Sequence, residues 1–172
     1  MDNDDGSRSR DDRQPAGEGW FDDLTRLPGP AFWESIVAAE SARCERFRRP
    51  ATIVLVESIG FEEVYRDWGR AVALRDVVEV GRILRAGCRA SDFVVRIGET
   101  RFGILLTETD EVAAINVVER LRVACETKLS SRPNPARIAF GWASNGDPTT
   151  LVAAVGRAEE RLFREEAAPD DP

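Results

Sequence analysis

The chain contains no histidine, which excludes imidazole general bases and histidine-ligated metal centres from its chemistry. The cysteines Cys44, Cys88 and Cys125 are far apart and odd in number, so they form neither a Cys-x-x-Cys motif nor a disulfide framework. We interpret them as buried free thiols in a reducing cytoplasm. An apolar run of roughly 18 residues, as a membrane-spanning helix requires, is also absent. The acidic N-terminus lacks the apolar segment of a secretory signal.

Lysine is almost absent as well, since Lys128 is the only one among 24 basic residues. These are outnumbered by 31 acidic residues, and the net charge of -7 argues against nucleic-acid binding by a generic basic surface. A bias of genomic composition is the simplest explanation of the arginine excess. Arginine also holds planar anions and stacks on bases, so the sequence still allows specific anion sites.

What is present is the composition of a globular domain. Hydrophobic residues make up 42% of the 172 residues and charged residues 32%, which suits one domain of ordinary size. Residues 1–19 are polar and acidic, and we predict a disordered tail there. We assign residues 20–166 to the folded domain and 167–172 to a short acidic C-terminal tail.

Hydrophobic periodicity predicts helices and strands in alternation. The strands are expected at residues 51–59, 92–97, 102–107 and 137–144, and the helices at 32–47, 61–68, 74–88, 149–164 and directly after Asp110, which can cap its helix. The second and third strands are separated by about four residues that include Gly98, which is typical of a β-hairpin. This order predicts an α+β sandwich, in which helices cover a mixed sheet.

The hairpin turn carries a resemblance to a known family. Residues 96–102, Arg-Ile-Gly-Glu-Thr-Arg-Phe, resemble the signature turn of the GGDEF, or diguanylate cyclase, domain. Residues 22–28 resemble the family's opening Asp-x-Leu-Thr-Gly-Leu-Pro motif, and residues 55–61, 140–143 and 157–163 are similar to its first strand, a later strand and its closing helix. The resemblance covers about residues 20–166. It implies a central, mainly antiparallel five-stranded sheet flanked by helices.

The resemblance also implies a catalytic site, which this sequence has changed. The family joins two GTP molecules with the help of two divalent metals held by carboxylates. Here Glu57 keeps one metal-binding carboxylate, whereas Thr100 replaces the other and Arg101 replaces the acid that follows. Positions of the family's turn glycine, guanine-reading residues and phosphate-binding lysines hold Glu99, Tyr65, Leu74, Glu62 and Glu166. We therefore expect an inactive enzyme with no catalytic residues, no bound metal and no Mg²⁺ requirement.

A second family site is retained in the sequence. The motif Arg89-Ala90-Ser91-Asp92 stands nine residues before Gly98, where many members carry the Arg-x-x-Asp inhibitory site for cyclic di-GMP. Arg89 can pair with a phosphate or stack on guanine, and Asp92 can accept the N–H groups of a guanine edge. Arg120 stands where the family often adds another arginine. The alternatives are a local salt bridge or strand cap for Arg89 and Asp92, and an ordinary surface role for Arg120.

The resulting functional prediction is a cytoplasmic cyclic di-GMP receptor that signals through a protein partner, with a ligand-linked homodimer as one form of output. A ligand-independent interaction scaffold is the first alternative, and a residual diguanylate cyclase working beside an active partner is the second. Trp33 and Trp142 are expected to pack in the core. Trp68 is expected either to fill the empty guanine pocket or to contact a partner, and Trp20 to mark a docking edge with Phe21.

Overall fold

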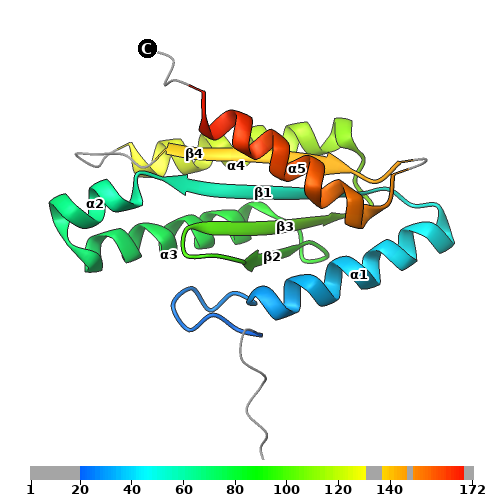
Figure 1. Cartoon of the computed structure of the whole chain (residues 1–172), viewed down its shortest axis with the longest axis horizontal. Helices are drawn as coiled ribbons and strands as arrows, with labels where there is room; N and C mark the ends of the chain where they lie inside the picture. The colour runs from blue at the N-terminus through cyan, green and yellow to red at the C-terminus, as the bar shows by residue number, and fades with distance from the viewer. Residues whose placement is uncertain (1–19, 131–136, 147–148, 169–172) are drawn as a thin grey trace, which may run out of the picture.

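The computed structural model describes residues 20–130, 137–146 and 149–168 (Figure 1). The predicted tail 1–19, most of the predicted loop 130–135 and the last four residues of the acidic tail lie outside the described residues. The elements follow in the order α1 (Pro30–Phe47), β1 (Ala51–Ile59), α2 (Phe61–Trp68), α3 (Arg70–Gly87), β2 (Phe93–Arg96), β3 (Arg101–Thr107), α4 (Glu111–Leu129), β4 (Arg137–Ser144) and α5 (Leu151–Glu166).

The strands form one antiparallel sheet in the order β2-β3-β1-β4. The α+β class is therefore confirmed, but the prediction of five strands was wrong for the described residues, which form four. Two further pairings, Phe21 with Pro28 and Gly146 with Thr149, are single bridges and do not extend into strands. The sequence itself has four β-rich runs, and the fifth strand was expected only from the family resemblance.

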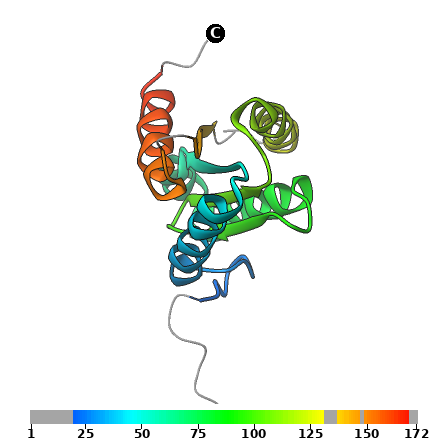
Figure 2. The same cartoon turned by 90° about the vertical axis from the view of Figure 1, so that its right-hand side faces the viewer.

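Helices cover both faces of the sheet, as the end-on view shows (Figure 2). Along β1, Val54 and Val56 belong to the core that α3 and α4 close, whereas Ile53 and Leu55 belong to the core that α1 and α5 close. Because successive side chains of a strand point to opposite faces, a strand covered on both sides must be apolar throughout. This explains the continuous apolar run at the start of β1.

Helix ends coincide with residues suited to them. Pro30 begins α1, where its missing N–H group costs nothing and its fixed φ suits a helix. Asp110 caps α4 as predicted, its side chain accepting from the Ala113 N–H group at 2.8 Å, and Thr150 caps α5 in the same way. Gly69, with φ of 83°, separates α2 from α3 in a conformation that favours glycine.

Close packing fixes where the helices sit on the sheet. A side chain at Gly141 would overlap the backbone of α5 at Ala158 and Leu162, so α5 lies directly against β4. The indole of Trp33 in α1 packs onto Gly103 of β3 in the same manner. Trp33 is buried and Trp142 is partly buried against the core, as expected, whereas Trp68 is exposed. Trp68 therefore does not fill a pocket in the free domain.

Arginine side chains cover the outer edge of β4. Arg122 of α4 donates to the Ile138 carbonyl, while Arg161 and Arg157 of α5 donate to the carbonyls of Trp142 and Ser144. These carbonyls point away from β1 and have no strand partner at this edge of the described sheet. The guanidinium groups therefore satisfy backbone acceptors that a further strand would otherwise use.

Among the described residues, no helix combines the length and the apolar character needed to cross a lipid bilayer.

Candidate functional site

The end of β1 and the β2–β3 turn form an ion-paired cluster. The antiparallel register places Glu57 directly opposite Arg101. The Nε atom of Arg101 donates to Oε2 of Glu57 at 2.6 Å, and the Thr100 hydroxyl donates to Oε1 of the same carboxylate. Arg101 also donates through Nη2 to Oε1 of Glu166, at the end of α5, at 3.4 Å. Both carboxylate oxygens of Glu57 are thus engaged by neighbouring side chains.

A cavity of about 370 Å³ opens beside this cluster. It is lined by five carboxylates together with Ser58, Ile59, Gly60, Phe61 and Thr100; the carboxylates are those of Glu57, Glu62, Glu63, Glu99 and Glu166. The structure thus brings together Glu57, Glu62, Glu99, Thr100 and Glu166 at one cavity with Arg101 beside it. It does not bring Tyr65 or Leu74 into the lining, since Tyr65 is exposed on α2 and Leu74 is half-buried on α3.

The residues present do not fit a divalent metal. Within residues 20–130, 137–146 and 149–168, no group of three or more cysteine or carboxylate side chains is arranged to hold a metal ion. The carboxylate of Glu57 would have to release both Thr100 and Arg101 before it could ligate a cation. The guanidinium of Arg101 would also repel a divalent ion electrostatically.

Arg96 holds the hairpin turn against the Asp22 turn, and the sequence alone did not single out this residue. Its Nη1 atom donates to Oδ1 of Asp22 at 2.6 Å, and Nη2 donates to the Glu99 carbonyl at 2.7 Å. Asp22 in turn accepts from the N–H group of Thr25 at 2.6 Å and from its hydroxyl at 2.5 Å. Burial opposes ionisation of Asp22, but these hydrogen bonds and Arg96 outweigh it and lower its pKa below the ordinary value.

The turn that begins at Asp22 departs from the family's opening motif at one residue. Arg26 stands where the opening motif has glycine, and its φ of 62° lies in the left-handed region. Glycine adopts that region without steric cost, whereas arginine is strained there. The backbone of the turn has been kept although the residue that suits it has been replaced.

The Arg89–Asp92 segment forms the turn between α3 and β2. Asp92 is 5% exposed, and its carboxylate accepts from the backbone N–H groups of Arg89 at 2.9 Å and Thr107 at 3.3 Å. Arg120 of α4 donates to the Gly87 carbonyl at 2.8 Å, which places its guanidinium at the same turn. The structure therefore gathers Arg89, Asp92 and Arg120 around one loop.

Arg85 holds this loop in shape and was missed by the sequence reasoning. It donates to the carbonyls of Asp92, at 2.7 Å, Cys88, at 3.3 Å, and Arg89. Its position in the last turn of α3 was the available signal, because basic side chains there can reach the terminal carbonyls of a helix. With Arg85 and Arg120 both turned onto backbone carbonyls, the loop carries a concentration of positive charge.

The side chain of Arg89 is the exception in this loop. No hydrogen bond or ion pair ties its guanidinium to another residue in the part of the chain that the structure describes. Arg89 instead lines a cleft of about 640 Å³ between α1 and the β2–β3 hairpin. Arg43 and Phe93 line the same cleft, so cationic and aromatic groups face one space.

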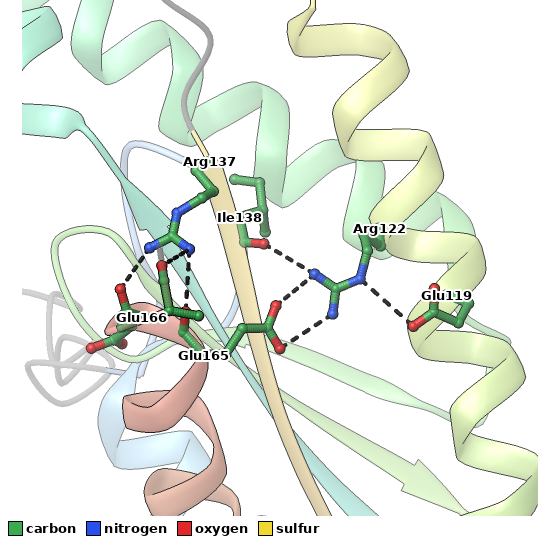
Figure 3. Close-up of polar contacts among 7 residues, drawn as sticks. Glu119, Arg122, Arg137, Ile138, Glu165 and Glu166 are labelled. Atoms are coloured by element: carbon green, nitrogen blue, oxygen red, sulfur yellow. Dashed lines mark hydrogen bonds and ion pairs between the residues drawn. The ribbon is translucent and has the colours of Figure 1, made fainter. Parts of the chain in front are cut away.

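The far end of the ion-paired cluster is anchored by two further arginines (Figure 3). Arg137 donates to the carbonyls of Glu165, Glu166 and Ala168, at 3.2, 2.6 and 3.1 Å. Arg122 donates to both carboxylate oxygens of Glu165, at 2.5 and 3.3 Å. These contacts fix the last turn of α5, and they thereby position the Glu166 side chain beside Arg101.

Comparison with known proteins identifies this arrangement. Residues 19–171 match the family described as diguanylate cyclase, GGDEF domain. The chain belongs to the GGDEF domain family. Among curated relatives, diguanylate cyclase DosC of Escherichia coli is 29% identical over 139 residues, which cover 80% of this chain and 28% of DosC. Diguanylate cyclase DgcP of Pseudomonas aeruginosa is 27% identical over 168 residues, covering 96% of this chain and 25% of DgcP.

Solved structures agree with the GGDEF fold. The GGDEF domain of DgcB from Caulobacter crescentus, in complex with c-di-GMP, superposes with a TM-score of 0.80 at 15% identity, covering 86% of this chain and 90% of that one. Diguanylate cyclase SiaD from Pseudomonas aeruginosa, in complex with its activator SiaC, gives 0.77 at 25% identity, covering 85% and 57%. This GGDEF chain spans about a quarter of the length of the curated relatives described above.

Proposed function

We propose that this GGDEF domain does not synthesise cyclic di-GMP and instead binds it. The absence of synthesis is inferred from the position of the Arg101 guanidinium between the carboxylates of Glu57 and Glu166. An internal cation stands where the family resemblance calls for the acid that follows the metal-binding residue of the turn, and that metal-binding position holds the neutral Thr100. The enzymes named among the relatives are cyclases, so this chain would have kept their fold without their reaction.

The surroundings of Arg101 support the same conclusion. Two-metal phosphoryl chemistry needs carboxylate oxygens that are free to coordinate, and those of Glu57 are engaged. The adjoining cavity presents further carboxylates from Glu62, Glu63 and Glu99. A triphosphate entering it would meet like charge on most sides. Leu74, at a position that reads guanine in the family, has no hydrogen-bonding group to offer the base.

Binding of cyclic di-GMP is supported by the loop between α3 and β2. Arg89 lines the 640 Å³ cleft, and its guanidinium makes no hydrogen bond or ion pair with another described residue. A guanidinium can bind a phosphate through two parallel N–H groups. Arg120 has further N–H groups beyond the one that donates to Gly87. A dianionic dinucleotide laid across this loop would therefore meet two arginines.

Asp92 contributes differently in the free domain. Its carboxylate holds the N–H group of Arg89 and so fixes the backbone from which that side chain projects. To accept a guanine edge as well, Asp92 would exchange its longer contact with Thr107, at 3.3 Å, for the ligand. We propose this exchange as the local rearrangement that accompanies binding.

The comparisons provide precedents for both halves of the proposal. The DgcB domain was solved with c-di-GMP bound, and SiaD was solved with an activator protein. A GGDEF domain can therefore hold the dinucleotide or associate with a regulatory protein. For this chain we propose that the ligand-bound form is recognised by a protein partner, which converts binding into an output.

Titration calorimetry with cyclic di-GMP tests the receptor function. We expect binding in the low micromolar range or tighter, lost in Arg89→Ala. Arg82→Ala is the matched control, because Arg82 is an exposed arginine on α3, the helix that leads into this loop, and pairs only with Glu79 among the described residues. Its binding should equal that of the wild type.

A second titration with GTP and Mg²⁺, followed by chromatography for cyclic di-GMP, tests inactivity. Neither binding heat nor product is expected. Product formation would show that the protein is a cyclase and that the Arg101 cluster opens. If neither nucleotide binds, the receptor proposal fails, and a ligand-independent scaffold explains the retained fold.

A further inference from the structure

One end of the molecule carries an exposed aromatic helix face. Phe61, Tyr65 and Trp68 recur at positions i, i+4 and i+7 of α2 and so share a side of it. The Phe61 and Tyr65 rings stack with their centroids 6.4 Å apart, while Tyr65 is 45% and Trp68 53% exposed. Val64, three residues after Phe61, is buried on the same side, and Phe61 packs partly against the core. The helix therefore rests on the body along one edge of this face and leaves Tyr65 and Trp68 exposed.

An acidic cavity adjoins this face. Phe61, Glu62 and Glu99 are among the residues that line it. Neither of these two carboxylates makes an ion pair among the residues that the structure describes, and both residues are exposed. We refer to Glu62, Tyr65, Trp68 and Glu99 as the acidic end.

The opposite end of the molecule carries the complementary chemistry. The segment Arg46–Arg49 closes α1, and its Phe47 side chain is 58% exposed with the Arg46 guanidinium 5.2 Å from the ring centroid. Arg49 pairs with Glu108, but Arg46 and Arg48 make no ion pair within the described residues. Arg48 adopts a left-handed conformation, with φ of 54°, that ends the helix. We refer to this segment as the basic end.

The two ends cannot satisfy each other within one molecule. The basic end precedes β1 and the acidic end follows it, so a strand of nine residues separates them. At about 3.3 Å per residue, that strand is about 30 Å long. Figure 1 shows α2 at one extreme of the long axis and the C-terminal end of α1 at the other. Each end must therefore find its complement on another molecule or remain solvated.

We propose that the acidic end of one copy binds the basic end of a second copy. In this contact Arg46 and Arg48 pair with Glu62 and Glu99, and Phe47 covers part of the Tyr65 and Trp68 surface. Guanidinium groups over exposed aromatic rings add a cation–π attraction. The contact joins unlike ends, so it repeats along a row of copies or closes on itself. It does not depend on nucleotide binding.

Sedimentation of the full chain without nucleotide tests the proposal. We expect the average mass to rise above the 19.1 kDa of the monomer as protein concentration increases from micromolar to millimolar in about 0.1 M salt. At that ionic strength the net charge of each copy is screened beyond about 10 Å, while groups in contact still attract. In about 1 M salt the mass should return toward that of the monomer.

Charge reversal at each end then identifies the contact. Glu62→Lys with Glu99→Lys should abolish association, and so should Arg46→Glu with Arg48→Glu. A mixture of the two double variants should associate again, because each retains the end that the other lacks. Glu159→Lys with Glu160→Lys is the matched control for the acidic-end variant, since these exposed α5 residues lie outside both ends and replace the same two carboxylates by lysines.

The proposal is overturned if the wild-type chain stays monomeric throughout the concentration range. It is also overturned if the double variants associate like the wild type, or if the mixture stays monomeric. Circular dichroism of each variant confirms that it is folded, so a loss of association cannot come from unfolding. Because no nucleotide is present, these outcomes are independent of whether cyclic di-GMP binds.

Discussion

Replacing Arg101 by alanine tests how much the ion-paired cluster at the end of β1 contributes to the free energy of unfolding. The Glu57 side chain is 14% exposed and that of Arg101 is 41% exposed, so the pair lies between the buried and surface cases. Removing one partner of a buried pair costs about 3–5 kcal/mol, and exposed pairs contribute about 0.2–1 kcal/mol. With a contact of 2.6 Å and the weaker one to Glu166, we expect Arg101→Ala to lower the free energy of unfolding by about 2 kcal/mol.

Urea unfolding of the wild type, Arg101→Ala, Glu57→Gln and the double variant forms the assay. A loss of about 2 kcal/mol shifts the midpoint by about 1 M urea for a slope of about 2 kcal/mol/M. The coupling between the two substitutions should be about 1 kcal/mol, because each removes the same contact. A coupling within about 0.3 kcal/mol of zero would show that Arg101 and Glu57 act independently, so that Arg101 would not occupy the Glu57 carboxylate as an internal cation.

Three further outcomes are expected. Gly141→Ala should lower the free energy of unfolding by about 3 kcal/mol in urea, because the new methyl group overlaps the α5 backbone at Ala158; an unchanged midpoint would contradict that packing. Because the pKa of Asp22 is lowered from its ordinary value of 3.8, its ionised carboxylate stabilises the folded domain fully at pH values above 3.8. The difference in unfolding free energy between wild type and Asp22→Asn should therefore shrink as the pH falls through the pKa of the folded state, and a difference that stays constant with pH would contradict this. Cys125 is buried, whereas Cys88, predicted to be buried, is only partly so; desolvation raises the pKa of the Cys88 thiol to about 11 and that of Cys125 to about 12. Both should therefore alkylate slowly at pH 8 until urea unfolds the chain, and labelling of the folded protein at the rate of a free thiol would contradict these raised pKa values.

Most of the fold could be predicted because periodicity and turn chemistry point to the same elements. The predicted boundaries of β1 and β4 match those in the structure, since both are short apolar runs between polar segments. The predicted start of α3, Leu74, lies four residues after the observed start at Arg70, because the helix opens with two exposed residues, Arg70 and Ala71. Gly69 was the better boundary signal, as its positive φ ends α2 and opens α3 together.

The candidate site could be predicted only in part. The hairpin register follows from the turn, so the approach of Arg101 to Glu57 is implied by the strands that carry them. The roles of Arg85, Arg96 and Arg137 could not be foreseen in this way. Each reaches backbone carbonyls with a long side chain, and such contacts leave no periodic trace in the sequence.

The arginines along β4 have a consequence for how the protein behaves in a crowded solution. An uncovered sheet edge is a template on which another chain can extend the sheet, which is a route to fibrils and to exchange of strands between molecules. An incoming strand would have to displace Arg122, Arg157 and Arg161 from the carbonyls of Ile138, Ser144 and Trp142. Copies that meet at high concentration are therefore directed toward reversible contacts between side chains, which dilution and salt can undo.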